Sequence, residues 1–347
     1  MKKSKLWIGG EHIEPSSGEY FEDLNPSDQT VIASVAKGTP NDVDKAVKSA
    51  QAAFHSFSES PAKEREAILS RAAALVERDR DQYLQLLIEE VGSPIMKAQF
   101  EVDYCINAFR AASGVPRRLT GQTMPLDRPG AFGMSIREPV GVVACITPFN
   151  VPLLKNVKQI AMVIATGNTS VLLPSEFASQ ITVKFAETLN EAGTPAGVFN
   201  YVTGNPFEIG DTLTRHPEIA AINFCGSPRI GKHVAELAGK ELKPVTLELG
   251  GENPLAALAR APGPPRRGHR AVRGRAGHPE TRVRARPVNS SSPPPLSRPS
   301  AASVWGRRRR RRRRAQPRAA RAAAPHAAAS SDPTASARRR PRRSRAG

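Results

Sequence analysis

The feature that most constrains the fold of this chain is a regular alternation of short β-rich runs and helical stretches after Pro139. The β-rich runs cover residues 140–147, 169–173, 198–202, 220–224 and 245–249, and helical stretches between them cover residues 153–166, 177–192, 206–215 and 229–239. Strands that alternate with helices need crossover connections, which are right-handed and give a parallel sheet covered on both faces. We therefore expect an α/β fold with an open, parallel, five-stranded, Rossmann-like sheet.

Residues 1–118 do not show the alternation of strands and helices that begins after Pro139. Short apolar pieces between turn residues predict short surface strands up to position 35. From Thr39, followed by Pro40, apolar residues recur at helical spacing, and further helical stretches run over 61–91 and 97–112. Residues 119–138 contain several Gly and Pro and predict an extended arm, so the α/β core is expected over 139–254.

The composition changes abruptly after Pro254. Residues 255–347 hold 26 Arg, no Lys and two acids, whereas the residues before them hold 25 Lys+Arg and 30 Asp+Glu. Such a tail buries too little apolar surface to offset chain entropy, so we expect it to be disordered. One interpretation is that its arginine runs bind nucleic acid or another polyanion. The interpretation that we favour is a frameshift, because Arg, Ala, Pro and Gly have GC-rich codons.

Neither membrane segments nor a metal site are expected from the sequence. No apolar run approaches the roughly 20 residues that cross a bilayer, and no signal-peptide stretch follows the N-terminal lysines. Cys105, Cys145 and Cys225 lack metal-ligand spacing and are typical of small buried residues in a reducing compartment. We therefore expect a soluble, cytoplasmic protein.

The turns that follow the five strands are the candidate site, because ligands of open α/β sheets bind at the carboxyl ends of the strands. These turns are polar or contain glycine: TPFN (147–150), PSE (174–176), TGN (203–205), CGSPRIG (225–231) and LGG (249–251). Gly226 and Ser227 begin a helix whose N–H groups can bind a pyrophosphate, although the spacing also fits an ordinary strand–helix turn. Glu248 ends an apolar strand, where desolvation can raise the pKa of a carboxyl and make it a general base. The alternative is a Glu on an exposed edge.

Four motifs, in order and at comparable spacing, resemble those of the aldehyde dehydrogenase superfamily over residues 7–254. They are ITPFNVPL (146–153), GNTSVLLPSE (167–176), FCGSPRIGK (224–232) and LELGGENP (247–254). The resemblance implies the N-terminal, NAD- or NADP-binding part of an enzyme that oxidises an aldehyde to a carboxylic acid. It also implies a homo-oligomer assembled partly through the arm, and Glu252 hints at the branch that oxidises aromatic aldehydes.

The resemblance also implies residue roles. Asn150 matches the amide that stabilises the oxyanion formed when a thiolate adds to the aldehyde, with a turn-forming helix cap as its alternative. Glu248 matches the base that activates water for thioester hydrolysis. Glu176 matches the acid that binds the adenosine ribose, and its alternative is a first-turn Glu favoured by the helix dipole. The other matching cofactor positions are Thr147, Pro148, Phe149, Gly226, Ser227, Ile230, Leu249 and Gly250.

The chain also departs from the family pattern. Leu173 stands where the family usually has a lysine near the adenosine ribose or its phosphate, so the choice between NAD and NADP stays open. The nucleophilic cysteine of the family follows the general base, but no cysteine follows Cys225 here. Since hydride transfer needs a covalent thiohemiacetal, we expect this chain to be catalytically incompetent. The alternative function is polyanion or nucleic-acid binding through the arginine-rich tail.

Overall fold

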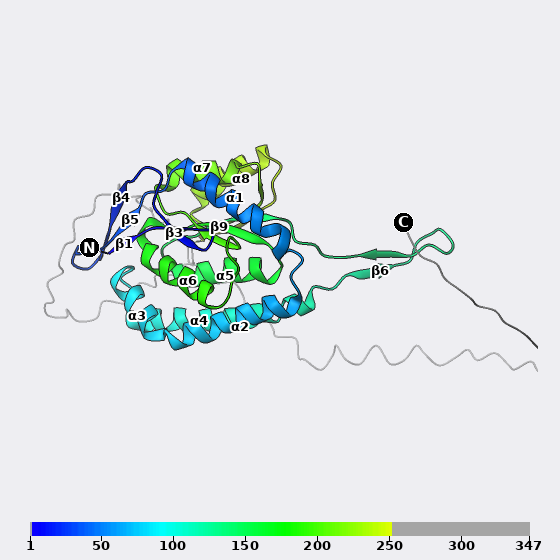
Figure 1. Ribbon diagram of the computed structural model, residues 1–347, viewed down its shortest axis with the longest axis horizontal. Helices are drawn as coiled ribbons and strands as arrows, with labels where there is room; N and C mark the ends of the chain where they lie inside the picture. The colour runs from blue at the N-terminus through cyan, green and yellow to red at the C-terminus, as the bar shows by residue number, and fades with distance from the viewer. Residues whose placement is uncertain (1, 252–347) are drawn as a thin grey trace, which may run out of the picture. The chain divides into compact units, whose positions relative to one another are not determined.

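The computed structural model describes residues 2–251, which contain a seven-stranded sheet with helices on both faces (Figure 1). The strands of this sheet are β2 (Leu6–Ile8), β3 (Glu11–Ile13), β8 (Val142–Ile146), β9 (Thr169–Leu173), β10 (Phe199–Tyr201), β11 (Ile219–Gly226) and β12 (Val245–Leu249). The α/β fold class is confirmed. The expectations for residues 255–347, disorder and polyanion binding, lie outside the described residues.

The sheet differs from the prediction in its extent and in its strand directions. The strand order is β12-β11-β8-β9-β10-β2-β3. The five strands from β8 to β12 pair in parallel. The predicted sheet of five parallel strands is incomplete, because β2 and β3 continue the sheet beyond β10 in antiparallel orientation. Trp7 of β2 pairs with Tyr201 of β10, so residues far apart in the sequence complete a mixed sheet.

The order of the parallel strands reverses beside β8. The chain first passes from β8 to β9 and β10, and then returns to the other side of β8 to form β11 and β12. Ligands of open α/β sheets bind at such a switch point. Ile146 of β8 is in register with Phe224 of β11, so the turns after these two strands begin at the same level.

Helices cover both faces of the sheet, and the strand residues alternate between the two cores. One face carries α1 (Pro40–Phe57), α7 (Pro206–Arg215) and α8 (Pro228–Lys240); the other carries α2 (Ala62–Arg78), α3 (Arg80–Glu89), α4 (Ile95–Ser113), α5 (Pro152–Ala165) and α6 (Ser179–Glu191). Val171 and Leu173 of β9 join the core under α1, α7 and α8, whereas Leu172 joins the opposite core. This period of two is what a strand buried on both faces requires.

Local sequence explains where several helices begin. In the first turn of α1, the Asp42 carboxylate accepts hydrogen bonds from the backbone N–H and the hydroxyl of the N-cap Thr39, at 3.0 and 2.9 Å. Ser227 is the N-cap of α8, where its Oγ accepts from the Ile230 N–H at 3.4 Å. Such caps satisfy helix N–H groups that have no partner within the helix. The helical stripe expected over residues 61–91 is divided at Asp79 into α2 and α3.

The N-terminal region and the arm form two smaller sheets. β1 (Lys3–Ser4), β4 (Tyr20–Leu24) and β5 (Val31–Ala36) make a three-stranded sheet in the order β1-β5-β4. β6 (Gln122–Met124) and β7 (Gly133–Ser135) pair antiparallel and project from the helices as a hairpin (Figure 1). The domain limits at residues 118, 138 and 254 stay predictions. Within residues 2–251, no helix has the length and apolar character that crossing a membrane requires.

Candidate functional site

Two cavities open at the edge of the sheet where the parallel strands end. The larger has a volume of about 440 Å³ and lies over the ends of β8, β9 and β11, between α7 and α8. The smaller has a volume of about 210 Å³ and lies at the turn that follows β10. Pro206 lines both cavities, so they are neighbours. Their size and their place at the switch point suit a ligand as long as a dinucleotide.

Three positions singled out in the sequence line these cavities. Ile230 and Leu173 line the larger one, and Glu176 lines the smaller one. Glu176 is half-buried and begins the 3₁₀ helix η2 (Glu176–Ala178), so a ribose-binding role and a first-turn role both fit its position. The structure therefore brings a carboxylate to the smaller cavity and two apolar side chains to the larger cavity beside it.

Gly226 and Ser227 lie where β11 meets α8. A Cβ atom at Gly226 would come within 2.6 Å of the Phe224 ring, so a side chain there would displace that ring. Arg229 and Ile230, in the first turn of α8, line the larger cavity. The N-terminus of α8 therefore opens onto the larger cavity, and a helix N-terminus attracts anionic groups such as phosphates.

The turn after β8 mixes buried and exposed residues. Thr147 is buried, and its hydroxyl donates to Asn156 Oδ1 at 2.8 Å, so it fixes the turn to α5. Pro148 is half-buried, and Phe149 is 52% exposed with its ring edge-to-face against Phe177. Asn150 is exposed, and since α5 has Val151 as N-cap and no side-chain cap, Asn150 is not a helix cap.

The surroundings of Glu248 correct one expectation. β12 is the edge strand of the sheet among the described residues, and the Glu248 side chain is 50% exposed. Lys155 Nζ donates to one carboxylate oxygen, and Lys158 Nζ lies 3.6 Å from the other. The hydrogen bond from Lys155 lowers the pKa of Glu248, and the small burial opposes this only in part. The expected rise of its pKa by desolvation was wrong, and the exposed-edge alternative describes its position.

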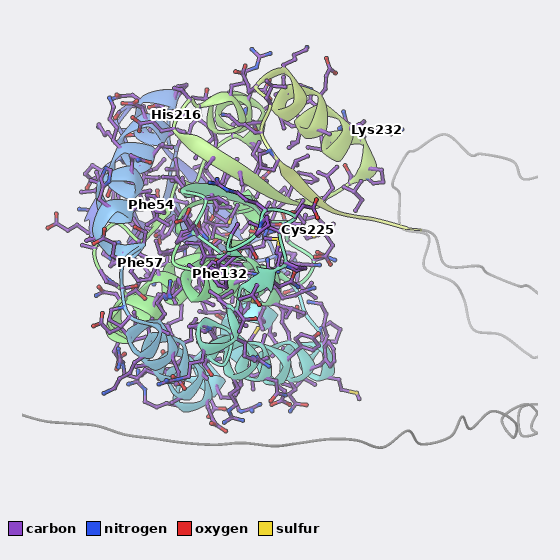
Figure 2. All side chains as sticks on the ribbon, turned by 90° about the vertical axis from the view of Figure 1, so that its right-hand side faces the viewer. Phe54, Phe57, Phe132, His216, Cys225 and Lys232 are labelled. Atoms are coloured by element: carbon purple, nitrogen blue, oxygen red, sulfur yellow. The ribbon has the colours of Figure 1, made fainter. Side chains whose placement is uncertain are left out.

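Lys155, Lys158 and Cys225 form a cluster with Glu248 that the sequence interpretation missed. Cys225, labelled in Figure 2, is in register with Glu248. Its thiol interacts with the Lys155 side chain. Burial nevertheless raises the pKa of the Cys225 thiol, because it outweighs the nearby lysine. The sequence signal for this cluster was the pair of lysines one helical turn apart, in the helix that follows the TPFN turn.

The remaining predicted positions and cysteines have simpler surroundings. Leu249 is 39% exposed at the end of β12, and its side chain lies against Gly231, where a Cβ would clash. Gly250 follows it beside Pro228. Cys105 and Cys145 are fully buried, as expected for small apolar residues, and burial raises the pKa of both thiols.

Comparison of sequences identifies the family. Residues 12–262 match the Aldehyde dehydrogenase family. The 2,5-dioxopentanoate dehydrogenase of Saccharolobus solfataricus is 36% identical over 252 residues, which cover 72% of this chain and 52% of that relative. The salicylaldehyde dehydrogenase of Pseudomonas putida is 34% identical over 259 residues, covering 74% and 54%. The chain thus spans about half the length of the curated relatives it matches.

Comparison of structures gives the same result. The salicylaldehyde dehydrogenase from Pseudomonas putida G7, solved with salicylaldehyde, matches with a TM-score of 0.71 and 33% identity over 72% of this chain and 52% of that chain. An NAD-dependent aldehyde dehydrogenase from Sinorhizobium meliloti matches with a TM-score of 0.71 and 34% identity over 73% and 51%. The resemblance carried by the four motifs is confirmed, and this chain belongs to the aldehyde dehydrogenase family.

Proposed function

We propose that this chain forms the NAD- or NADP-binding part of an aldehyde dehydrogenase, an oxidoreductase acting on aldehydes. The observation that carries the proposal is the pair of neighbouring cavities at the switch point of the sheet. Similar solved structures include an NAD-dependent enzyme and an NADP-dependent one. Leu173, which lines the larger cavity, carries no charge that could select for or against the extra phosphate of NADP. The proposal therefore covers both NAD and NADP.

Each of the turns at the strand ends would bind a different part of the cofactor. Gly226 and Ser227, at the N-terminus of α8, would hold its phosphates, since helix N–H groups there bind anions. Glu176 would accept hydrogen bonds from ribose hydroxyls. The turn of Pro148 and Phe149 would flank the nicotinamide. The bound cofactor would supply the acceptor for a hydride.

Titration calorimetry with NAD⁺ and NADP⁺ tests this proposal. Ile230→Trp fills the larger cavity, and we expect it to abolish the binding that the unchanged chain shows. Lys232→Gln is the matched control, because Lys232 is exposed on α8 and does not line the cavity (Figure 2). Thermal melts verify that both variants fold. Absence of binding of either nucleotide to the unchanged chain contradicts the proposal.

We further propose that the chain binds cofactor without oxidising an aldehyde at a useful rate. A thiolate is the nucleophile in such chemistry, and all three thiols are buried with raised pKa values. Loss of a covalent nucleophile costs on the order of a millionfold in rate in other enzymes. The aldehyde suggested by the salicylaldehyde dehydrogenase relatives is aromatic. NADH formation from salicylaldehyde at the rate of a full-length relative would contradict this proposal.

The partner of the arm is proposed to be a second copy of this chain. Several apolar arm residues are 46–72% exposed: Met124, Leu126, Phe132, Met134 and Ile136. An isolated two-stranded hairpin is marginal in water, so packing against another surface would stabilise it. Sedimentation should show an oligomer that the double change Phe132→Ser and Met134→Ser dissociates. Leu242→Ser, at a residue 92% exposed outside the arm, is the control, and a monomeric unchanged chain opposes the proposal.

A further inference from the structure

A third cavity lies between the end of α1 and the first half of α2, and its volume is about 370 Å³. Gly193 and Pro195, in the turn that precedes β10, form part of its wall, so it lies toward the amino end of that strand. The cofactor cavities open at the carboxyl ends of the strands, and this cavity shares no lining residue with either of them. It is therefore a separate space, large enough for a small organic molecule.

The residues that α2 contributes to this cavity form one helical stripe. They are Glu64, Ala67, Ile68 and Arg71. Since residues at positions i, i+3, i+4 and i+7 share one face of a helix, the cavity follows this face for two turns. A rise of about 1.5 Å per residue separates Glu64 from Arg71 by roughly 10 Å along the helix axis. The cavity thus has a carboxylate at one end, a guanidinium at the other end and apolar side chains between them.

Within residues 2–251, neither of these two charged groups belongs to an ion pair. The ion pairs of α2 involve other residues, namely Glu66, Glu77 and Arg78. Arg71 Nε donates to the Ala192 carbonyl at 2.7 Å, which holds the guanidinium beside the turn at Gly193. The remaining N–H groups of the guanidinium can therefore bind an anion, and the Glu64 carboxylate can bind a cation.

The end of α1 makes the Glu64 side of the cavity more favourable for a cation. Ser60 lies just before α2, and its hydroxyl donates to the Phe57 carbonyl at 2.6 Å. The Ser56 hydroxyl donates to the Ala53 carbonyl at 3.3 Å. Both serine oxygens line the cavity and keep lone pairs that can accept from an ammonium. The C-terminal end of a helix also attracts cations, and Phe57, labelled in Figure 2, adds apolar surface there.

We propose that this cavity binds a linear ω-amino acid, a zwitterion with an amino group at one end of its carbon chain and a carboxylate at the other. The ammonium binds Glu64. The carboxylate binds Arg71, since a guanidinium can donate to both carboxylate oxygens. The methylenes lie on Ala67 and Ile68. A molecule with only one charge would leave the opposite end of the cavity without a partner.

The separation of the two charged side chains sets the length of the ligand. In extended 6-aminohexanoate, the six bonds between nitrogen and carboxylate carbon span roughly 7 Å. A hydrogen bond of about 3 Å at each end then lets the molecule contact both Glu64 and Arg71. This cavity is separate from the cofactor cavities, so the proposal stands whether or not NAD or NADP binds.

Titration calorimetry on the full chain with 6-aminohexanoate, hexanoate and hexylammonium tests the proposal. We expect 6-aminohexanoate to bind about tenfold more tightly than either analogue, because only the zwitterion pairs with both ends of the cavity. The shorter 4-aminobutanoate should bind more weakly than 6-aminohexanoate. Hexanoate also controls for the 26 tail arginines, which would bind any carboxylate.

Two charge variants assign the two ends of the ligand. Arg71→Gln should weaken 6-aminohexanoate about five- to tenfold and reduce its affinity to that of hexylammonium. Glu64→Gln should reduce it to that of hexanoate. Lys63→Gln and Glu59→Gln are the matched controls, because both side chains are exposed and neither lines the cavity.

A variant of unchanged charge tests the cavity itself. Ala67→Phe fills the space between the charged ends and should abolish the binding of 6-aminohexanoate. Thermal melts verify folding, and if Arg71→Gln does not fold, Glu64→Gln and Ala67→Phe decide the outcome. Equal affinity for 6-aminohexanoate and hexanoate, no binding of 6-aminohexanoate, or binding unchanged by Ala67→Phe overturns the proposal.

Discussion

β9 and β12 are parallel strands of five residues in one sheet, yet their surroundings are opposite. Every residue of β9 is buried between neighbouring strands and two helical layers, whereas no residue of β12 is buried. β9 ends at Leu173, in the wall of the larger cavity, and β12 carries Glu248. The wall of the proposed cofactor site is therefore part of the packed interior. Glu248, the general base implied by the family resemblance, instead lies on an edge strand that pairs only with β11.

This contrast extends to the forces that hold each region. The interior is fixed by apolar packing, which salt hardly affects. The position of Glu248 depends on two lysines, of which Lys155 is 12% exposed and Lys158 43% exposed. Because the carboxylate itself is half-exposed, both ion pairs are partly screened by salt. The edge should therefore rearrange more readily than the interior.

The largest expected effect compares truncations in the two strands. Leu172→Ala removes a fully buried side chain of β9 and should lower the free energy of unfolding by about 2–5 kcal/mol. Leu247→Ala in β12 should cost less than about 1.5 kcal/mol, because Leu247 is partly exposed. Urea denaturation of both variants measures the difference. Equal losses of unfolding free energy in the two variants would contradict the proposed difference between the interior strand and the edge strand.

A buried ion pair on the helical layer under the sheet gives the next effect. Asp79 accepts from Lys184 Nζ at 2.6 Å and from Arg78 Nε at 2.7 Å, and its side chain is 8% exposed. The hydrogen bond from Arg78 is the main cause that lowers the pKa of Asp79 to about 2. Asp79→Asn should lower the free energy of unfolding by about 2 kcal/mol at neutral pH.

The pH dependence of this effect has a defined sign. Because the folded-state pKa of Asp79 lies below the unfolded one, its contribution is complete above the unfolded value and is lost as the pH falls toward about 2. The difference between Asp79→Asn and the unchanged chain should shrink over that window. Glu191→Gln, which removes the exposed partner of Arg78, is the control and should cost less than about 1 kcal/mol. If the difference in unfolding free energy between Asp79→Asn and the unchanged chain does not depend on pH, the loss of stability comes from packing and not from the charge of Asp79.

The preference for NAD over NADP tests whether Glu176, in the wall of the smaller cavity, contacts the cofactor. Glu176→Gln removes a negative charge that opposes the extra phosphate of NADP, so the affinity for NADP relative to NAD should rise about three- to tenfold. Calorimetry with both nucleotides measures the ratio. Glu187→Gln, an exposed acid on α6, should leave it unchanged. An unaltered ratio in Glu176→Gln would remove this residue from the cofactor site.

The smallest expected effect is a change in the pKa of Glu248 on the edge strand β12. Lys155→Met removes the hydrogen bond that lowers the pKa of Glu248, so that pKa should rise. Lys158→Met should raise it less, since its ammonium lies farther from the carboxylate and is 43% exposed. Carboxyl titration by nuclear magnetic resonance measures both shifts. A Glu248 pKa unchanged in Lys155→Met would show that the ion pairs do not hold the edge.

The sequence predicted those parts of the fold that depend on local patterns. The apolar periods located the strands that became β8 to β12, and Thr39 and Ser227 marked helix starts correctly. It did not predict β2 and β3 in the same sheet, because the pairing of Trp7 with Tyr201 depends on packing between distant segments. Nor did the apolar stripe reveal the break at Asp79, which lies where Arg78 and Lys184 converge.

For the candidate site, too, the sequence predicted what depends on local motifs and missed what depends on contacts between distant segments. Motifs located the strand-end turns, and Ile230, Leu173 and Glu176 line the cavities there. The state of Glu248 could not be read from its apolar neighbours, because the lysine that lowers its pKa comes from a helix far earlier in the chain. Likewise, the hydroxyl of Thr147 is used within the fold by Asn156, which no motif indicated.

Hydrogen exchange with and without saturating NAD⁺ tests most directly whether the turns at the strand ends form one cofactor site. We predict slower exchange in residues 147–150, 174–176 and 225–231 together, and unchanged exchange in α2 and α3. Protection confined to other segments, or to one of these turns alone, would contradict the account.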